Sequence, residues 1–377
     1  MKVLHATEID IGGTATVMNL LMRSQIADDR VTSCKCIAPE RIIDALDNSL
    51  IQYTSTFKRS GRNLLSLAHF AKALIKTIWR DNPDVIHLHS TFAGIVGRTI
   101  LVIMKPVRNP KVVYCPHGFS FLMEGSALKK FIFSKIEILL SYFTDKIICV
   151  SHYEKNAAIK AGISESKISV IHNGTPAFLA EDSRKTSPYP TQSDSTINYL
   201  FAGRQDKAKG FDILLAAMQK VTNHKIQLTV AGISESEVPE HAKLNNVTYL
   251  GWMSSKDLTS YFSHADALVL PSRWEGFPMV VLEAMSMGVP VIASNCTSLS
   301  EAVKHGVTGI LFNVSDSDSL SDIISNTSID ALHKMGRSGL ERFNENFTSE
   351  LMTHATSNLY SQLLTKHSKN NTTKDIA

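Results

Sequence analysis

Short runs of β-branched residues alternate with longer stretches of helical spacing along most of the chain, and this alternation constrains the fold more than any other feature. Such a pattern is typical of a parallel sheet covered by helices on both faces. In the first half we expect helices near residues 14–27 and 63–79. The strands expected there are Val3–Ala6, Val31–Ile37, Val85–His89, Lys111–Tyr114, Lys146–Val150 and Ser169–Ile171.

The alternation begins again after a polar stretch rich in Ser, Thr and Pro. A chain of 377 residues suits two domains of ordinary size. We therefore expect a doubly wound, Rossmann-like domain at 1–180, a linker at 181–196, a second such domain at 197–366 and a flexible tail at 367–377. Ligands of open α/β sheets bind beyond the carboxyl ends of the strands, so functional motifs should directly follow strands.

The net charge is small and unevenly distributed. The chain carries 39 Lys and Arg against 35 Asp and Glu, a formal charge of +4, whereas a nucleic-acid-binding protein typically has a basic stripe. Residues 1–180 hold 22 of these cations and 14 of the acids, so the first half is the basic one. We expect that half to meet an anionic membrane surface or an anionic acceptor, and we expect no nucleic-acid partner.

Cysteine usage and the N-terminus indicate a cytoplasmic protein. Most of the five cysteines lie in apolar runs rather than at metal-ligand spacing, which predicts reduced core thiols. No apolar run approaches the roughly 18 residues that a membrane-spanning helix needs. The N-terminus meets acidic residues almost at once and lacks the apolar region of a signal peptide.

The most informative motif is EGFPMVVLE, in which an acid, a turn, a helix start and a second acid follow an expected strand. Pro278 suits the first turn of a helix, and Glu283 would then lie about 7.5 Å along the helix axis from its start. An isolated glutamate more commonly caps a helix or faces solvent, but this context favours two carboxylates on one elongated ligand. The turn Gly276-Phe277-Pro278-Met279-Val280 leaves unpaired backbone N–H groups at a helix start, where an anion could bind.

A second motif, GRQDKAKG, also follows an expected strand and opens a helix. After Gly203, the Arg204 guanidinium offers a planar fork for two phosphate oxygens, and Lys209 adds a point charge beside the helix start. These features predict a diphosphate clamp. For Lys207 a solvated loop charge remains the alternative.

The first strand-to-helix turn contains Gly12 and Gly13, which let the backbone approach a phosphate or a sugar. A nicotinamide-dependent enzyme normally has GxGxxG with an acid about 20 residues later. Here the third glycine is absent and Val31–Ile37 contains no acid, which disfavours a simple dehydrogenase.

Several histidines lie on or directly after strands. His117 and Asn173 each precede a glycine at an expected strand end and should face the ligand. His87 and His89 share one strand, and we expect them to point to opposite faces and not to bind one metal together.

With these motifs in this order, the chain resembles the large retaining glycosyltransferase family four, which has the two-domain GT-B fold, and the likeness runs from Val3 to about Tyr360. The resemblance implies that Arg204 and Lys209 hold the diphosphate of a nucleotide-sugar and that Glu283 hydrogen-bonds the ribose. Many relatives continue Asn-Gly with Val-Asp, whereas this chain has Thr175 and Pro176, so no role of that Asp is carried over.

The resemblance also implies roles for the remaining residues of the motifs. Glu275 and the N–H groups of residues 277–280 would touch the donor sugar or its phosphate, and His117 would contact the transferred sugar. Gly203, together with the turn of Gly251, Trp252 and Met253 beside the base, completes the implied donor site. Gly12, Gly13 and Asn173 would line the acceptor side, with Gly13 also near the donor phosphate.

The expected reaction is sugar transfer from a nucleoside-diphosphate sugar, such as a UDP-sugar, to a hydroxyl acceptor with retention at the anomeric carbon. The leaving diphosphate would be stabilised by positive side chains, so no metal is expected, and Asp316-Ser-Asp318 is interpreted as a helix cap. The alternatives are an epimerase or a phosphorylase of the same fold, or a non-catalytic sugar-nucleotide module.

Family likeness favours a bacterial surface polysaccharide enzyme that acts on a glycan or a lipid-linked saccharide at the inner membrane face. The stretches Lys58–Arg80 and Leu128–Lys135 mix cations with apolar residues at helical spacing, which suits an anionic membrane surface. Ordinary sheet-covering helices with solvated lysines are the alternative interpretation.

Overall fold

The computed structural model describes residues 1–44, 46–61, 63–178, 186–189 and 196–372. It divides into two compact units: the first combines Met1–Gly174 with Ser349–Ala377, and the second is Thr175–Thr348. Most of the expected linker at 181–196 lies outside the described residues. The expectation that residues up to 366 belong to the second domain is wrong for 349–366, which belong to the first unit.

A seven-stranded parallel sheet forms the centre of the first unit, with strand order β3-β2-β1-β4-β5-β6-β7. Five of its strands match expected ranges closely, and β2 matches the later part of the range 31–37. The four-residue β3 has no counterpart among the expectations, because Thr-Ser-Thr-Phe is short and mostly polar. The strands are β1 (Lys2–Thr7), β2 (Ser33–Pro39), β3 (Thr54–Phe57), β4 (Val85–His89), β5 (Lys111–Cys115), β6 (Lys146–Cys149) and β7 (Ile168–Val170).

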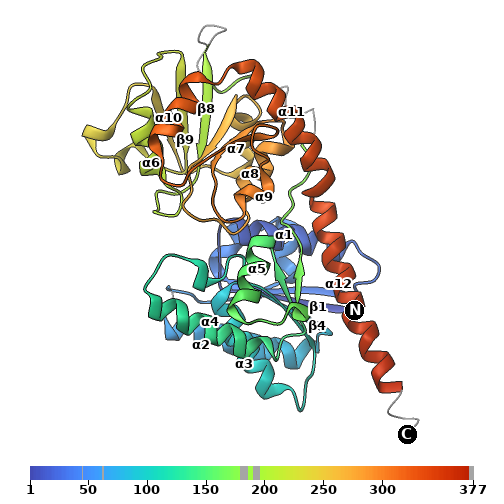
Figure 1. Cartoon of the computed structure of the whole chain (residues 1–377). Helices are drawn as coiled ribbons and strands as arrows, with labels where there is room; N and C mark the ends of the chain where they lie inside the picture. The colour runs from blue at the N-terminus through green and yellow to red at the C-terminus, as the bar shows by residue number, and fades with distance from the viewer. Residues whose placement is uncertain (45, 62, 179–185, 190–195, 373–377) are drawn as a thin grey trace. The chain divides into compact units, whose positions relative to one another are not determined.

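Helices α2, α3 and α4 lie side by side in the first unit, with α3 in contact with both of its neighbours (Figure 1). Helix α2 buries Phe70, Leu74 and Ile78, which are spaced by four residues and therefore share one helix face. These side chains join strand residues in one apolar core, while α1 covers a separate cluster over β2. The helices are α1 (Gly13–Ile26), α2 (Leu64–Asp81), α3 (Thr91–Met104), α4 (Ala127–Ser141) and α5 (His152–Ala161).

The last helix, α12 (Ser349–Thr372), returns to the first unit and packs against α1. Tyr360 is fully buried, and its hydroxyl group lies 2.6 Å from Nδ1 of His87. Near the start of the helix, the Gly174 N–H donates to the sulfur of Met352 at 3.2 Å. The expected flexible tail at 367–377 is wrong for 367–372, which are helical, and 373–377 lie outside the described residues.

The second unit contains a six-stranded parallel sheet with order β10-β9-β8-β11-β12-β13. Its strands are β8 (Ile197–Ala202), β9 (Ile226–Ala231), β10 (Val247–Gly251), β11 (Ala267–Leu270), β12 (Val291–Ser294) and β13 (Gly309–Phe312). Its helices are α6 (Phe211–Met218), α7 (Ser255–Phe262), α8 (Met279–Ser286), α9 (Leu299–Ala302), α10 (Ser317–Asn326) and α11 (Ile329–Asn346).

Both sheets are doubly wound, as the sequence predicts. Strand order runs one way from β1 and the other way from β4, and the same reversal occurs between β8 and β11. Beyond the carboxyl ends of such a pair, the loops diverge and leave room for a ligand. A ligand site is therefore expected at the segments that follow β1, β4, β8 and β11.

Candidate functional site

The loops after β8 and β11 contact each other closely in the second unit. Gly210 has a positive φ of 65°, and a Cβ atom there would lie 2.1 Å from the carbonyl oxygen of Pro271. Only glycine fits this close approach. The Arg273 N–H donates to the Ala208 carbonyl at 2.7 Å, which fastens the two loops together.

Lys209 and Glu275, one from each of these loops, form an ion pair. The Lys209 Nζ atom lies 2.7 Å from Oε1 of Glu275, and both side chains are mostly buried. Ser272 Oγ donates to the same carboxylate oxygen at 2.7 Å, and the Glu275 N–H donates to Thr297 Oγ1 at 3.0 Å. The structure therefore brings these two sequence-predicted residues together and holds the carboxylate in one orientation.

Arg204 and Trp252 are the exposed members of the predicted donor set. The Arg204 side chain is 77% exposed and has an ion pair with Asp206 at 3.2 Å. Trp252 is 81% exposed and follows Gly251, whose φ of 69° turns the chain at the end of β10. Gly203 continues the β8 pairing, since its N–H donates to Ala231. Arg204 is thus open to solvent on the same loop as the buried Lys209.

Helix α8 starts at Met279 directly after Pro278, as the motif predicts, and no side chain caps its first turn. Glu283 lies in the second turn and is half-buried. Among the described residues, none donates a hydrogen bond to its carboxylate. Burial raises the pKa of Glu283 to about 7. An unpartnered carboxylate of this kind can accept hydrogen bonds from ligand hydroxyl groups.

In the first unit, Gly12 is the N-cap of α1 and has a φ of 87°. Apart from Gly12 and its two chain neighbours, no heavy atom of the described residues lies within 4 Å of the position that a Cβ of Gly12 would occupy, so the space in front of this turn is open. Gly13 is the first residue of the helix. Asn173 follows β7 by three residues and is buried.

His117 follows β5 in a left-handed backbone conformation, with a φ of 52°. Such a conformation is uncommon outside glycine and must be held by its surroundings. The carboxylate of Glu154 holds it here, because Oε1 accepts from the N–H groups of Gly118 and Phe119 at 2.9 and 3.1 Å. Burial raises the pKa of Glu154 to about 7. Glu154 is not among the predicted site residues, because its position in α5 gives no signal of this contact.

Three histidines form a hydrogen-bonded chain that ends at His117. The Nδ1 atom of His5 lies 2.9 Å from Nε2 of His89, and Nδ1 of His89 lies 3.0 Å from Nε2 of His117. At the other end, Nε2 of His5 lies 2.8 Å from the amide oxygen of Gln25. We call these residues, Gln25, His5, His89 and His117, the histidine chain.

The expectation that His87 and His89 point to opposite faces is wrong. Residues two apart on a strand share a face, and the two rings are 4.0 Å apart between centroids. His5 pairs with His87 in the register of β1 and β4, so the ligand atoms of His5, His87 and His89 lie within 4.8 Å of one another. The sequence holds this signal, since His5 and the His-Leu-His run lie on strands that were both expected.

Burial disfavours the charged form of every ring in this group. It lowers the pKa of His5 and of His117 to about 4, and the pKa values of His87 and His89 fall well below the ordinary value. All four imidazoles are therefore neutral at pH 7.

Comparison with known proteins agrees with these features. The family model for glycosyl transferases group 1 matches residues 196–330, and the model for glycosyltransferase family 4 matches residues 11–177. An Escherichia coli relative, UDP-Gal:alpha-D-GlcNAc-diphosphoundecaprenol alpha-1,3-galactosyltransferase, is 30% identical over 76% of this chain and 76% of its own. The chain belongs to glycosyltransferase family 4.

This glycosyltransferase has further relatives in sequence and in fold. An uncharacterized 41.2 kDa protein in the cps region of Klebsiella pneumoniae is 38% identical over 87% of this chain and 90% of its own. The crystal structure of Anabaena HepE in complex with UDP-glucose superposes with a TM-score of 0.78 at 19% identity and covers 96% of this chain and 100% of that one. Both units therefore have the parallel α/β architecture of GT-B enzymes.

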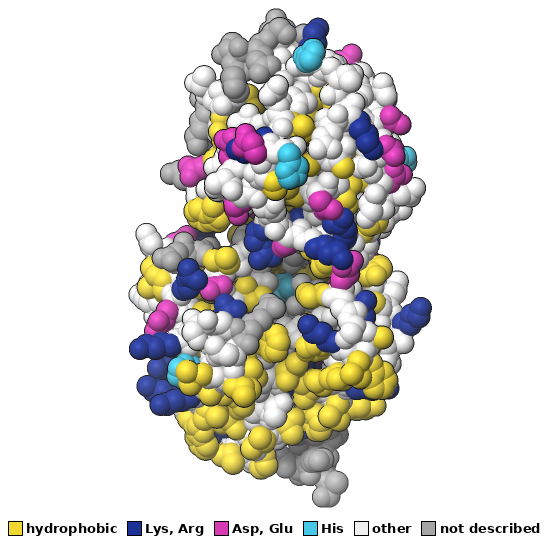
Figure 2. Space-filling view, turned by 90° about the vertical axis from the view of Figure 1, so that its left-hand side faces the viewer, with side chains coloured by type: hydrophobic (Ala, Val, Ile, Leu, Met, Phe, Trp, Pro, Cys, Tyr) yellow, Lys and Arg dark blue, Asp and Glu magenta, His cyan; other side chains and the backbone are white. Residues whose placement is uncertain are grey.

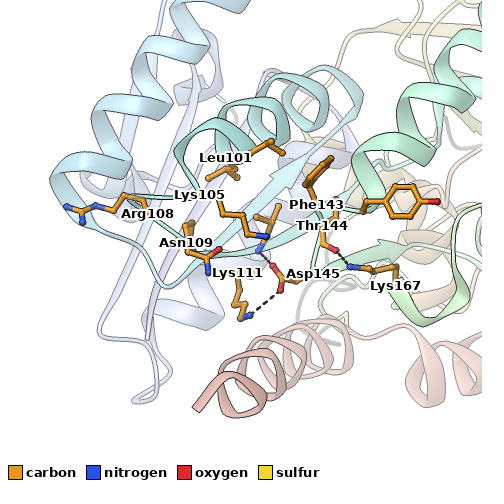
Figure 3. A pocket seen from close by; sticks show the side chains of 13 residues that line it. Leu101, Lys105, Arg108, Asn109, Lys111, Phe143, Thr144, Asp145 and Lys167 are labelled. Atoms are coloured by element: carbon orange, nitrogen blue, oxygen red, sulfur yellow. Dashed lines mark hydrogen bonds and ion pairs between the residues drawn. The ribbon is translucent and has the colours of Figure 1, made fainter. Parts of the chain in front are cut away.

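Two further features of the glycosyltransferase lie away from these loops. The Asp316 side chain accepts from the Ser319 N–H at 2.9 Å and caps α10, which confirms the interpretation of Asp316-Ser-Asp318 as a helix cap. A cavity of about 300 Å³ lies at the amino ends of β5, β6 and β7, the sheet edge opposite His117 (Figure 3). Two of its lining lysines bond within it, since Lys111 pairs with Asp145 at 3.2 Å and Lys167 Nζ donates to the Thr144 carbonyl at 2.8 Å.

Proposed function

We propose that this glycosyltransferase transfers a sugar from a UDP-sugar to a hydroxyl group of a lipid-linked saccharide, with retention of anomeric configuration and without a divalent metal. The observation that carries the donor half is the ion pair of Lys209 and Glu275, which joins the loops after β8 and β11 where the second sheet reverses. Glu283 in α8 adds a carboxylate to which none of the described residues donates a hydrogen bond. The acceptor would be an intermediate of a bacterial surface polysaccharide.

The donor would bind along the loops of the second unit. Arg204 and Lys209 supply positive charge for the diphosphate, together with the uncapped start of α8. Glu283 accepts hydrogen bonds from the ribose hydroxyl groups, and Trp252 beside Gly251 and Met253 borders the base. The UDP-Gal donor in the name of the E. coli relative and the UDP-glucose complex of HepE support a uridine nucleotide.

Retention would follow from a reaction on one face of the sugar. Double displacement needs a carboxylate nucleophile with a partner acid about 5 Å away. Glu275 does not suit that role, because one carboxylate oxygen already pairs with Lys209 and Ser272. In the proposed step the bond from the anomeric carbon to the diphosphate breaks, the acceptor oxygen bonds to the same face, and its proton passes to the leaving phosphate oxygen.

Positive side chains would stabilise the leaving diphosphate in place of a metal ion. Arg204 and Lys209 lie on one loop, with Lys209 fixed by its ion pair and Arg204 exposed. Charge stabilisation by preorganised groups is commonly the largest catalytic contribution, with single groups worth about 100- to 1000-fold in rate. The prediction is that EDTA leaves the activity unchanged.

The acceptor would bind to the first unit. Gly12 leaves open space at the start of α1, whose first residue is Gly13. His117 contacts the transferred sugar, and Asn173 lies at another strand end. These segments follow β1, β5 and β7, so they share one edge of the sheet.

A lipid-linked acceptor requires the enzyme to approach a membrane, and the outer surface of α2, α3 and α4 suits this. Among the described residues, most large apolar side chains that are exposed lie on these helices or just beyond them: Leu64, Leu65, Ile75, Trp79, Ile103, Val107, Met123, Leu128, Phe131, Ile132, Leu139, Tyr142 and Phe143. We call this set the apolar face. Lys72, Lys76, Lys129 and Lys135 are exposed on the same helices, and Figure 2 shows hydrophobic and basic side chains gathered on the first unit. A surface of this kind binds anionic lipid.

No helix among the described residues combines the length and the apolar character needed to cross a membrane. Peripheral contact through the apolar face is therefore the form of membrane association that we propose.

A thermal-shift panel of UDP-, GDP-, ADP- and CMP-sugars, with and without EDTA, tests the donor site. A ligand that binds only the folded state raises the melting temperature. We expect UDP-sugars to stabilise the protein whether or not EDTA is present, and Arg204→Ala to reduce the shift. If only a GDP-, ADP- or CMP-sugar stabilised the protein, the proposed UDP-sugar donor would be wrong and that nucleotide-sugar would be the donor. Release of a free epimer without acceptor would indicate an epimerase in place of a transferase. Cleavage that depends on inorganic phosphate would indicate a phosphorylase.

Vesicle flotation tests the membrane contact. We expect binding to vesicles that contain phosphatidylglycerol and loss of binding in Phe131→Ser/Ile132→Ser. Val307→Ser/Val314→Ser is the matched control, since it removes two exposed apolar side chains from the second unit. Equal flotation of both variants would contradict the assignment to the apolar face.

A further inference from the structure

The histidine chain has a direction, because a neutral imidazole carries one N–H donor and one bare nitrogen acceptor. Each ring in the chain must therefore donate on one side and accept on the other. The whole chain has two arrangements that differ in which way every hydrogen bond points. The group at its inner end, Gln25, selects between them.

Gln25 ends the chain with its amide oxygen. This oxygen lies 2.8 Å from Nε2 of His5 and also accepts from the thiol of Cys34 at 3.5 Å. Nε2 of His5 can donate or accept, so the Cys34 thiol is the donor that orients the amide with its oxygen toward His5. Since the oxygen only accepts, the proton of His5 must be on Nε2, and Nδ1 of His5 must accept.

The position of the His5 proton sets the direction of the two outer hydrogen bonds of the histidine chain. The bare Nδ1 of His5 accepts from Nε2–H of His89, and the bare Nδ1 of His89 accepts from Nε2–H of His117. The proton of His117 is then on Nε2, and its Nδ1 is bare. Among the described residues, none hydrogen-bonds to Nδ1 of His117, whose side chain is half-buried at the strand end.

We propose that the histidine chain fixes His117 in the tautomer protonated on Nε2, so that Nδ1 accepts a hydrogen bond from a hydroxyl group of the bound sugar. The second clause rests on the proposed function, whereas the tautomer is a property of the protein alone. Gln25, His5 and His89 are positioning residues in this scheme, because they act on the sugar only through His117. The low pKa of His117 agrees with a ring that stays neutral while it accepts.

Nitrogen NMR on protein labelled with ¹⁵N-histidine tests the tautomer directly in the free protein. The His117 signals are identified by their loss in His117→Gln. We expect an unprotonated Nδ1 and a protonated Nε2 in the wild type. In Gln25→Met, which removes the terminal acceptor at similar volume, we expect a mixture of both tautomers. His87→Phe is the matched control: it removes a buried ring beside the chain, and His117 should be unchanged.

A wild-type spectrum with the proton on Nδ1 would overturn the proposal, even if Gln25→Met failed to fold. An unchanged His117 tautomer in folded Gln25→Met would overturn the role of the chain. Stoichiometric zinc in the purified protein would also overturn it, since a metal at His5, His87 and His89 would replace the hydrogen bond between His5 and His89.

Donor analogues that lack one sugar hydroxyl test the hydrogen bond between the sugar and Nδ1 of His117. On the wild type, we expect loss of the hydroxyl that faces Nδ1 to lower kcat/KM by roughly 3- to 10-fold, in the range of one neutral hydrogen bond. In Gln25→Met this penalty should shrink, while analogues altered elsewhere behave alike in both proteins. An equal penalty in both proteins would contradict the sugar contact. If no nucleotide-sugar binds at all, the proposed function fails, and the NMR result still decides the tautomer.

Discussion

The two units of the molecule differ in the surroundings of particular charged side chains. The first unit keeps them inside and bonded to one another, as in Arg98 and Glu137, which are essentially unexposed and form an ion pair at 2.8 Å. In the second unit Arg204 is largely exposed on the loop after β8, and the Glu283 carboxylate in α8 accepts no hydrogen bond from the described residues. The Arg98–Glu137 pair is therefore closed to ligands, whereas Arg204 and Glu283 can still bond to one.

This difference indicates where substitutions should affect stability and where they should affect binding. A buried polar group that loses its partner has a large desolvation cost, whereas an exposed group returns to water. Changes in the first unit's interior should therefore unfold the protein, and changes on the second unit's loops should weaken donor binding in a protein that stays folded.

The largest effect is expected for Glu137→Leu. This change leaves the Arg98 guanidinium buried without its carboxylate and removes the acceptor of the Tyr114 hydroxyl, which donates to Glu137 at 3.0 Å. We expect a loss of about 3–5 kcal/mol in the free energy of unfolding, measured by urea denaturation. Arg98→Met/Glu137→Leu is the control, because it removes both charges. A loss in the double variant as large as in the single one would contradict this explanation.

Arg204→Ala should lower kcat/KM for sugar transfer by about 100-fold, because it removes one of the positive side chains that stabilise the leaving diphosphate. Its melting temperature should stay within a degree or two of the wild type, since surface ion pairs contribute little to stability. Lys220→Ala removes an exposed, paired cation outside the motif and should leave the activity unchanged. A marked fall in the melting temperature of Arg204→Ala would break the contrast between the units.

Glu283→Gln should stabilise the free protein and weaken its binding of nucleotide-sugar. A carboxyl group whose pKa is raised from 4.5 to about 7 by burial opposes folding once it ionises. This cost is absent below about pH 4.5, grows up to about pH 7 and stays constant above it. After allowance for partial exposure, we expect a gain of about 2 kcal/mol at pH 8, measured by denaturation. Equal stability of both proteins at pH 5 and at pH 8 would contradict it.

The smallest effect is expected for His87→Phe, measured as the loss of stability between pH 7.5 and pH 5. An imidazole with a folded pKa well below 6.5 supports folding above pH 6.5 and loses that contribution as the pH falls. Removing it should reduce the acid-induced loss by about 1–2 kcal/mol. His5, His89 and Tyr360 surround His87, and Glu154, whose raised pKa acts in the opposite direction, is present in both proteins. An identical pH dependence would contradict the prediction.

Much of the fold could be predicted from the sequence, because parallel strands in a covered sheet consist of short apolar runs that are distinct from the helices between them. The loops after β8 and β11 were also predictable, since glycines, a proline and charged residues follow those strands directly. The short strands β3 and β13 were not predicted, since each contains only four residues and β13 begins with a glycine. Short segments take their structure from the neighbouring strand rather than from their own pattern.

The interior of the first unit was less predictable. The contacts of Glu154 with the His117 loop and of Tyr360 with His87 join residues far apart in the chain, and no local pattern indicates them. The face shared by His87 and His89 was predictable, because residues two apart on a strand point to the same face. The prediction of opposite faces misapplied this periodicity. The roles of Arg204, Lys209 and Glu283 stay predictions, which the donor-binding experiments test.

The return of α12 to the first unit has a consequence for biosynthesis. As the ribosome produces the chain, the second unit, residues 175–348, is complete before the helix that covers α1 and seats Tyr360 against His87 has been made. The unit that begins first is therefore finished last, and until then its nascent sheet lacks one of its helices. Domains commonly fold in the order of synthesis, but here the N-terminal half waits for the C-terminus. A chain truncated before Ser349 should leave an incomplete first unit prone to capture by chaperones, beside a second unit that has already folded.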